Sequence, residues 1–175
     1  MKAPFTAALL ALALAGPLHA GELVPWKGGA TPPLLLKDPS GAAHELSAYH
    51  GKVVLVNFWA TWCEPCRAEM PSMQRLRQRF AGRPFAVLAV NFMESDEKVT
   101  AYLQSEKIDL PALMDNDGAS AKRWKVRILP ASFVVDARGR IRYALTGEAN
   151  WDAPEFVSAI ERLFEREASP TRASR

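Results

Sequence analysis

The sequence predicts a single α/β domain built on a mixed sheet. Two short apolar runs, residues 53–59 and 85–92, are separated by a segment with the apolar spacing of a helix. Two further strands, joined by an Ala-Arg-Gly turn, follow nearer the C-terminus. A helical crossover between similar strands implies a parallel pair, whereas a tight turn joins antiparallel strands. The order β-α-β-α-β-β-α therefore indicates both kinds of pairing, with helices flanking the sheet.

A hairpin precedes this unit. The stretch LLLKDPSGAAHELSAY, residues 34–49, holds a short apolar run, a Pro-Ser-Gly turn and a second short extended piece. Proline and glycine between two extended pieces are typical of a hairpin turn. Because the hairpin lies outside the alternation of strands and helices, we expect it at an edge of the sheet.

The first apolar run leads directly into a helix. Val53–Trp59 is apolar except for Asn57 and is too short for a free-standing helix, which predicts a strand buried on both faces. Residues 85–92 repeat this pattern. Between the two strands, apolar residues recur at spacings of three and four, with arginines on the opposite face. This spacing predicts an amphipathic helix from Cys66 to Phe80 with Met70, Met73 and Leu76 on its inner face.

The remaining elements follow in order. Ser95 is a predicted N-cap for a helix that runs to about Lys107, with acidic residues in its first turn. Residues 115–126 indicate a turn and a short helix, and residues 132–145 indicate the two strands of the C-terminal hairpin. Asp152 can cap a last helix that runs through Arg166.

The first twenty residues have the pattern of a secretory signal. Lys2 leads into an apolar run of eleven residues, Phe5 to Ala15, and small residues precede a cleavage point after Ala20. The run falls short of the roughly 20 residues of a membrane-spanning helix, so a retained anchor is the alternative that we favour less. We expect a periplasmic protein with an irregular segment at 21–33, one domain at 34–166 and a mobile tail at 167–175.

Net charge argues against a nucleic-acid partner. The chain carries a formal charge of +3, and removal of Lys2 with the signal (3 − 1) leaves about +2. Proteins that bind nucleic acid through the phosphate backbone usually present a much stronger basic surface. We therefore expect no nucleic acid among the partners.

The two cysteines of the chain, Cys63 and Cys66, lie at the predicted junction of strand and helix. An inert disulfide, a pair of metal ligands and a redox-active dithiol all remain possible for such a pair. A structural metal site needs about four ligands, and the mature chain adds only His44 and His50, so we expect no metal and no other cofactor. A helix N-terminus lowers the pKa of a thiol, which favours Cys63 as a nucleophile and Cys66 as its resolving partner.

The run GKVVLVNFWATWCEPCRAEMP, residues 51–71, closely resembles the thioredoxin superfamily, and within it the exported TlpA/ResA/CcmG (DsbE)-like thiol-disulfide oxidoreductases. The resemblance extends over nearly all of residues 31–166. It implies a thioredoxin fold, a central mixed sheet flanked by helices, with the hairpin added at the N-terminal side. It also implies a reducing role in cytochrome c maturation or a similar periplasmic task.

The resemblance assigns roles to individual residues. It makes Cys63 the attacking thiol and Cys66 the resolving thiol. Trp62 would shield the pair, and Glu64 and Pro65 would tune its redox potential. Pro71 corresponds to a proline that kinks the helix. Pro130 corresponds to a cis-proline beside the active site, and the backbone of Leu129 would pair with the substrate chain.

The resemblance also concerns proton transfer. Glu94 corresponds to an acidic residue that the reducing branch carries near its dithiol. A partly buried carboxylate with a raised pKa could accept the proton of Cys66, so we count Glu94 as catalytic. The alternative is a solvated carboxylate at a helix start. Asn57 stands where thioredoxins carry a buried aspartate, and an amide cannot take a proton.

Three functions remain in competition. The first is a periplasmic reductant of client proteins, either apocytochrome c or a copper-site protein, recharged by a membrane electron donor of the DsbD/CcdA type. The second is a disulfide-forming oxidase or isomerase, which Glu64 disfavours because oxidases usually carry a histidine in that dipeptide. The third is a copper chaperone, whose longer cysteine spacing and later histidine are absent. A peroxiredoxin is disfavoured because its Pro-x-x-x-Thr-x-x-Cys motif is missing.

Overall fold

The computed structural model describes residues 21–168. The predicted signal and the part of the predicted tail from 169 onward lie outside the described residues. The strands are β1 (Val24–Pro25), β2 (Leu35–Lys37), β3 (Ala43–Glu45), β4 (Val53–Trp59), β5 (Phe85–Phe92), β6 (Ala112–Asp115), β7 (Ala131–Val135) and β8 (Ile141–Thr146). The helices are a short 3-10 helix, η1 (Leu46–Tyr49), and α1 (Glu64–Arg79), α2 (Asp96–Ser105), α3 (Ala119–Arg123) and α4 (Pro154–Ala168).

The described strands form one mixed sheet in the order β1-β8-β7-β4-β5-β6-β2-β3. The strands β4, β5 and β6 are parallel neighbours, and the other pairs are antiparallel. The predicted parallel pair and the C-terminal hairpin are therefore confirmed, and the β2–β3 hairpin lies at an edge as expected. β6 was not predicted from the sequence, so one helical crossover was expected where the structure has two, through α1 and α2.

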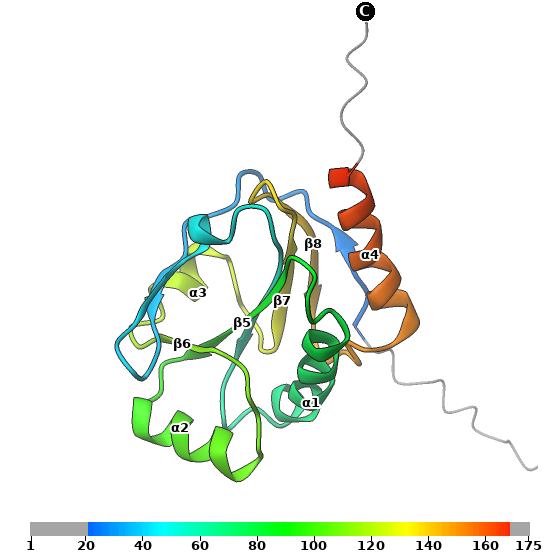
Figure 1. Ribbon diagram of the computed structural model, residues 1–175. Helices are drawn as coiled ribbons and strands as arrows, with labels where there is room; N and C mark the ends of the chain where they lie inside the picture. Colours follow the sequence, from blue (N-terminus) through cyan, green and yellow to red (C-terminus); the bar gives the residue numbers. More distant parts are fainter. Residues whose placement is uncertain (1–20, 169–175) are drawn as a thin grey trace, which may run out of the picture.

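Helices cover both faces of the sheet. Figure 1 shows α1 and α4 on one side and α3 on the other. Alternate residues of β4 belong to two separate cores: Leu55 and Trp59 pack with α1, α2 and α4, whereas Val56 and Phe58 pack with α3 and η1. All seven residues of β4 are buried, which confirms the prediction of a strand covered on both faces.

The segment from residue 21 to 33 is more ordered than its composition suggested. It contributes the edge strand β1, and the Trp26 ring packs edge-on against Phe133 with centroids 5.7 Å apart. The Thr31 hydroxyl accepts a hydrogen bond from the Ile141 N–H. This segment therefore covers part of the core that α3 leaves open.

Helix boundaries differ slightly from the predicted ones. α1 begins at Glu64, two residues before the predicted start, and α4 extends to Ala168 rather than Arg166. Ser95 caps α2 as predicted, because its side chain accepts a hydrogen bond from the Lys98 N–H. No helix in residues 21–168 is long and apolar enough to cross a membrane.

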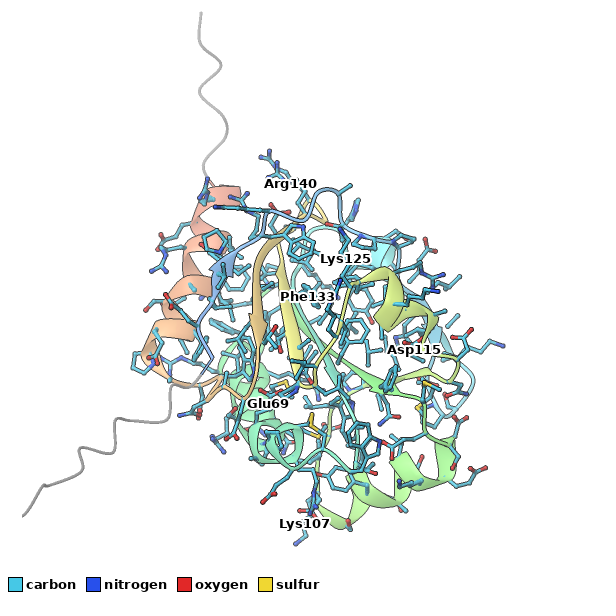
Figure 2. All side chains as sticks on the ribbon, turned by 180° about the vertical axis from the view of Figure 1, so that it is seen from behind. Glu69, Lys107, Asp115, Lys125, Phe133 and Arg140 are labelled. Carbon is cyan, nitrogen blue, oxygen red and sulfur yellow. A yellow bond between two sulfur atoms is a disulfide. The ribbon has the colours of Figure 1, made fainter. Side chains whose placement is uncertain are left out.

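The two ends of the sheet are chemically different. At one end β4 stops at Trp59 and leads into the dithiol, and Phe58 pairs with Ala131 of β7. At the other end Val54 pairs with Val135, just before the turn that contains Arg140. Figure 2 shows Glu69 at the dithiol end and Arg140 at the far end.

Candidate functional site

The dithiol lies where β4 ends and α1 begins. Cys63 and Cys66 form a disulfide, with Cα atoms 5.3 Å apart. Cys63 is 6% exposed, whereas Cys66 is completely buried. An incoming client therefore meets the sulfur of Cys63 first, and Cys66 lies behind it.

The start of α1 favours a negative charge on Cys63. Cys63 is the N-cap residue, and its side chain makes no capping hydrogen bond. The first N–H groups of a helix lack intrahelical partners, and the helix dipole is positive at this end. Pro65 fits the first turn because its missing N–H would have no partner there. Pro71 lies inside α1, as the resemblance implied.

A buried carboxyl group lies one helical turn behind the dithiol. Glu69 follows Cys66 by three residues, which places it on the same face of α1, and it is only 1% exposed. Its carboxylate accepts hydrogen bonds from Asn57 Nδ2 at 2.7 Å, from the Ala149 N–H at 3.1 Å and from Trp151 Nε1 at 3.2 Å. Glu69 thus joins α1 to β4 and to the segment before α4.

Burial changes the acidity of this group. Desolvation raises the pKa of Glu69 to about 8, although the hydrogen bonds from Ala149, Asn57 and Trp151 oppose the shift. Most Glu69 side chains are therefore protonated at neutral pH and ionise in mildly basic solution. A pKa near that of a free thiol, about 8.5, is well suited to exchange a proton with a cysteine.

Glu94 has a different environment from the one expected. Its carboxylate accepts hydrogen bonds from the Thr61 N–H at 2.7 Å, the Thr61 hydroxyl at 2.6 Å and Asn91 Nδ2 at 2.9 Å, and Lys98 Nζ lies 2.7 Å away. Burial would raise the pKa of Glu94, but the interactions with Lys98, Thr61 and Asn91 outweigh it and lower the pKa. The expectation of a raised pKa is therefore wrong, because a cation and three hydrogen-bond donors hold the carboxylate ionised. Glu94 fixes Thr61, two residues before Cys63.

The segment before β7 completes the site. The Leu129–Pro130 peptide bond is cis, as the resemblance implied. Beside it lies a groove of about 360 Å³. The groove is lined by Trp62, Phe92, Ala121, Val126, Arg127, Ile128 and Leu129. Trp62 is 63% exposed, so its ring forms a wall of this groove on the protein surface.

A model of the AhpC/TSA family matches residues 28–144, which includes the dithiol, Glu69, Glu94 and Pro130. The chain belongs to the AhpC/TSA family. Among curated relatives, the thioredoxin-like protein YneN of Bacillus subtilis is 39% identical over 119 residues, which are 66% of this chain and 69% of the relative. The thiol-disulfide oxidoreductase ResA of Bacillus subtilis is 34% identical over 121 residues, which are 69% of this chain and 68% of ResA.

Solved structures agree with this assignment. A thiol:disulfide interchange protein DsbE from Chlorobium tepidum superposes with a TM-score of 0.69 at 26% identity, covering 83% of this chain and all of that one. This confirms the predicted thioredoxin-like fold with a mixed sheet flanked by helices. With its Cys63–Cys66 pair, this AhpC/TSA-family member is a thiol-disulfide oxidoreductase of the ResA/DsbE type.

Sequence reasoning missed Glu69 in this oxidoreductase, although a signal was present. The buried stripe of α1 runs through Cys66, Met70 and Met73, and Glu69 falls within it. A lone acid on the apolar face of a predicted helix marks a buried carboxyl group. Within residues 21–168, no group of three or more His, Cys, Asp or Glu side chains is arranged to hold a metal ion.

Proposed function

We propose that this oxidoreductase is a periplasmic reductant of disulfides in client proteins. The observation that carries the proposal is the acidic setting of the dithiol. Glu64 lies between the cysteines, and the buried Glu69 lies on the same helix face one turn behind Cys66. The nearest cation in sequence, Arg67, places its guanidinium 5.6 Å from the centre of the Tyr102 ring.

This setting favours electron donation. A thioredoxin-like protein becomes a strong oxidant when its reduced form is stabilised, as it is in DsbA. The carboxylate of Glu64 acts in the opposite sense, because a nearby negative charge raises the pKa of a thiol and destabilises its thiolate. A less stable reduced form gives up its electrons more readily. The helix N-terminus at Cys63 still supplies enough thiolate for nucleophilic attack.

The reaction proceeds by two exchanges. The Cys63 thiolate attacks one sulfur of the client disulfide, which forms a mixed disulfide and releases the first client thiolate. A minority of Glu69 side chains is ionised at neutral pH. In those molecules Cys66 passes its proton to Glu69 and attacks the Cys63 sulfur, which forms the Cys63–Cys66 disulfide and releases the second client thiolate. Two electrons move to the client, and each client thiolate takes up a proton. Glu94 holds Thr61 in place, and the backbone of Leu129 pairs with the client chain.

The surroundings in the cell form part of the same proposal. The signal-like pattern of residues 1–20 supports export, and a membrane electron donor of the DsbD/CcdA type would return two electrons to Cys63 and Cys66. The resemblance of residues 51–71 to the TlpA/ResA/CcmG (DsbE)-like proteins implies a client in cytochrome c maturation, such as apocytochrome c. A copper-site protein is the second client class.

A trapping experiment tests the order of events. The Cys66→Ala variant, incubated in its thiol form with a disulfide-bonded client peptide, should accumulate a mixed disulfide through Cys63, which mass spectrometry detects. The Cys63→Ala variant should accumulate little, because Cys66 is buried. Equal trapping by both variants, or none by either, would contradict the assigned roles.

A further inference from the structure

We propose that the groove beside the dithiol selects clients whose disulfide is followed by a large apolar side chain and then by acidic residues. This inference rests on the proposed reductase function and names the client class that the same site would prefer. It is carried by three features of the surface between Trp62 and Lys122.

The first feature is exposed apolar surface around the groove. Trp62 is 63% exposed, Ile128 is 65% exposed and Met93 is 56% exposed, although most large apolar side chains of the described residues are buried. Trp62 and Ile128 line the groove itself, together with Phe92 and Val126. Exposed apolar side chains that gather at one concave place favour the binding of an apolar group.

The second feature is a stretch of open backbone. Residues 127–129 run beside the groove, and in the described part of the chain none of their N–H or C=O groups forms a hydrogen bond. Backbone groups of this kind pair readily with an extended peptide. A client strand lying along residues 127–129 would place its cysteine beside Cys63 and the neighbouring side chain over the groove.

The third feature is a strip of positive charge. Lys122, Arg123, Lys125 and Arg127 are all exposed, and none of them forms a salt bridge with any described residue. No acidic residue occurs from 118 to 135. Arg127 lines the groove, and Figure 2 shows Lys125 further toward the Arg140 end of the molecule. The strip therefore begins at the groove and leads away from the dithiol.

Acidic groups near this surface do not cancel the strip. Glu94 is paired with Lys98. Asp117, which accepts a hydrogen bond from the Ala119 N–H at the start of α3, is a single exposed carboxylate against the four cations of the strip. Glu64 is exposed beside the cysteines and would repel carboxylates there. A client therefore fits best with its apolar side chain next to the cysteine and its carboxylates further along, against Arg127 and Lys125. Basic residues at those positions would be repelled.

The test compares three peptides that contain the same disulfide. Each carries phenylalanine next to the attacked cysteine, followed by two glutamates, two glutamines or two lysines. The second-order rate constant for reduction by the dithiol form is measured at low salt and in 0.5 M NaCl. We expect the glutamate peptide to be reduced about tenfold faster than the lysine peptide at low salt, and the ratio to shrink at high salt.

Charge-reversal variants test whether Lys125 and Arg127 cause the preference for the glutamate peptide. The double variant Lys125→Glu/Arg127→Glu should abolish or reverse the preference for the glutamate peptide. The matched control is Lys27→Glu/Lys52→Glu, which changes the net charge equally. Lys27 is exposed and follows Trp26, whose backbone N–H donates a hydrogen bond to the Arg142 carbonyl, at the end of the sheet far from the dithiol. Lys52 immediately precedes β4 at the same end. This control should keep the full preference.

A second arm tests the apolar part. Ile128→Ser should slow the reduction of the phenylalanine peptide severalfold and leave a glycine-containing counterpart almost unchanged. Equal rates for the glutamate and lysine peptides, or the same loss in the control variant, would overturn the acidic-client inference and leave the reductase function intact. Failure to reduce any of the peptides would overturn both.

Discussion

Glu69 is the residue on which the account of the site depends most. It is almost completely buried, three protein groups donate hydrogen bonds to it, and it shares a helix face with Cys66. Asn57 stands at the position where thioredoxins carry a buried aspartate. Its side-chain amide donates a hydrogen bond to Glu69 and cannot take a proton itself. The proton-accepting carboxyl group thus belongs to α1, and a hydrogen bond from Asn57 of β4 fixes its position.

The raised pKa of Glu69 predicts a pH-dependent stability. The folded chain keeps a proton up to about pH 8 that the unfolded chain releases near pH 4.5, so the free energy of unfolding should fall as pH rises between these values. Between pH 5 and pH 9 the decrease due to this group is at most about 4 kcal/mol. Urea unfolding of the oxidised protein and of Glu69→Gln at several pH values measures it.

The Glu69→Gln variant is the control for the pH dependence of stability. Glu69→Gln cannot ionise, so its unfolding free energy should vary less with pH in this window, and it should exceed that of the parent above pH 8. The second exchange step should also slow, so the mixed disulfide should persist longer. Parallel stability profiles for the two proteins would show that Glu69 is not the buried proton carrier.

Glu94 is predicted to position the loop before the dithiol. Glu94→Ala leaves the partly buried N–H of Thr61 without its acceptor and should lower the free energy of unfolding by about 1–3 kcal/mol. Glu97→Ala is the matched control, because Glu97 is an exposed acid three residues further on, in the first turn of α2, and it should cost less than about 1 kcal/mol. Thermal unfolding measures both. A loss in Glu97→Ala as large as that in Glu94→Ala would refute the positioning role.

At the scale of single elements, β4 explains why the dithiol is held rigidly. Its alternate side chains enter two cores, so removing bulk on either face should destabilise the protein. We expect Leu55→Ala to cost about 2–5 kcal/mol and Phe58→Ala about 3–5 kcal/mol in urea unfolding. Val24→Ala, in the exposed edge strand β1, should cost less than about 1 kcal/mol. A small effect of either core substitution would mean that one face of β4 is open.

Long, strongly patterned elements were predictable from the sequence, and short ones were not. β4, β5 and α1 are long enough for apolar spacing to identify them. β6 was missed because it has four residues, follows Pro111 and ends in Asp115, so it resembles a loop. Asp115 is nevertheless buried, because its carboxylate accepts hydrogen bonds from the Ser120 and Ala121 N–H groups and starts α3. These partners lie five and six residues further on, and the apolar spacing that identifies strands does not reveal them.

The candidate site likewise contains residues that the sequence predicted and contacts that it could not predict. Cys63, Cys66 and the cis bond at Pro130 were expected from motif and resemblance, and the structure brings them to one end of the sheet. The partners of Glu69 could not be predicted, because Ala149 and Trp151 lie about eighty residues further along the chain. For Glu94, the position of Lys98 one turn later was visible, but the three hydrogen bonds from Thr61 and Asn91 were not.

For the whole molecule, the central claim is that the dithiol donates electrons. The measurement that tests it most directly is the equilibrium between the dithiol and disulfide forms in glutathione or dithiothreitol buffers, followed by thiol trapping or tryptophan fluorescence. The account predicts a midpoint potential near or below about −220 mV, in the range of thioredoxin and glutaredoxins. A midpoint near about −120 mV, where DsbA lies, would contradict it and favour an oxidase.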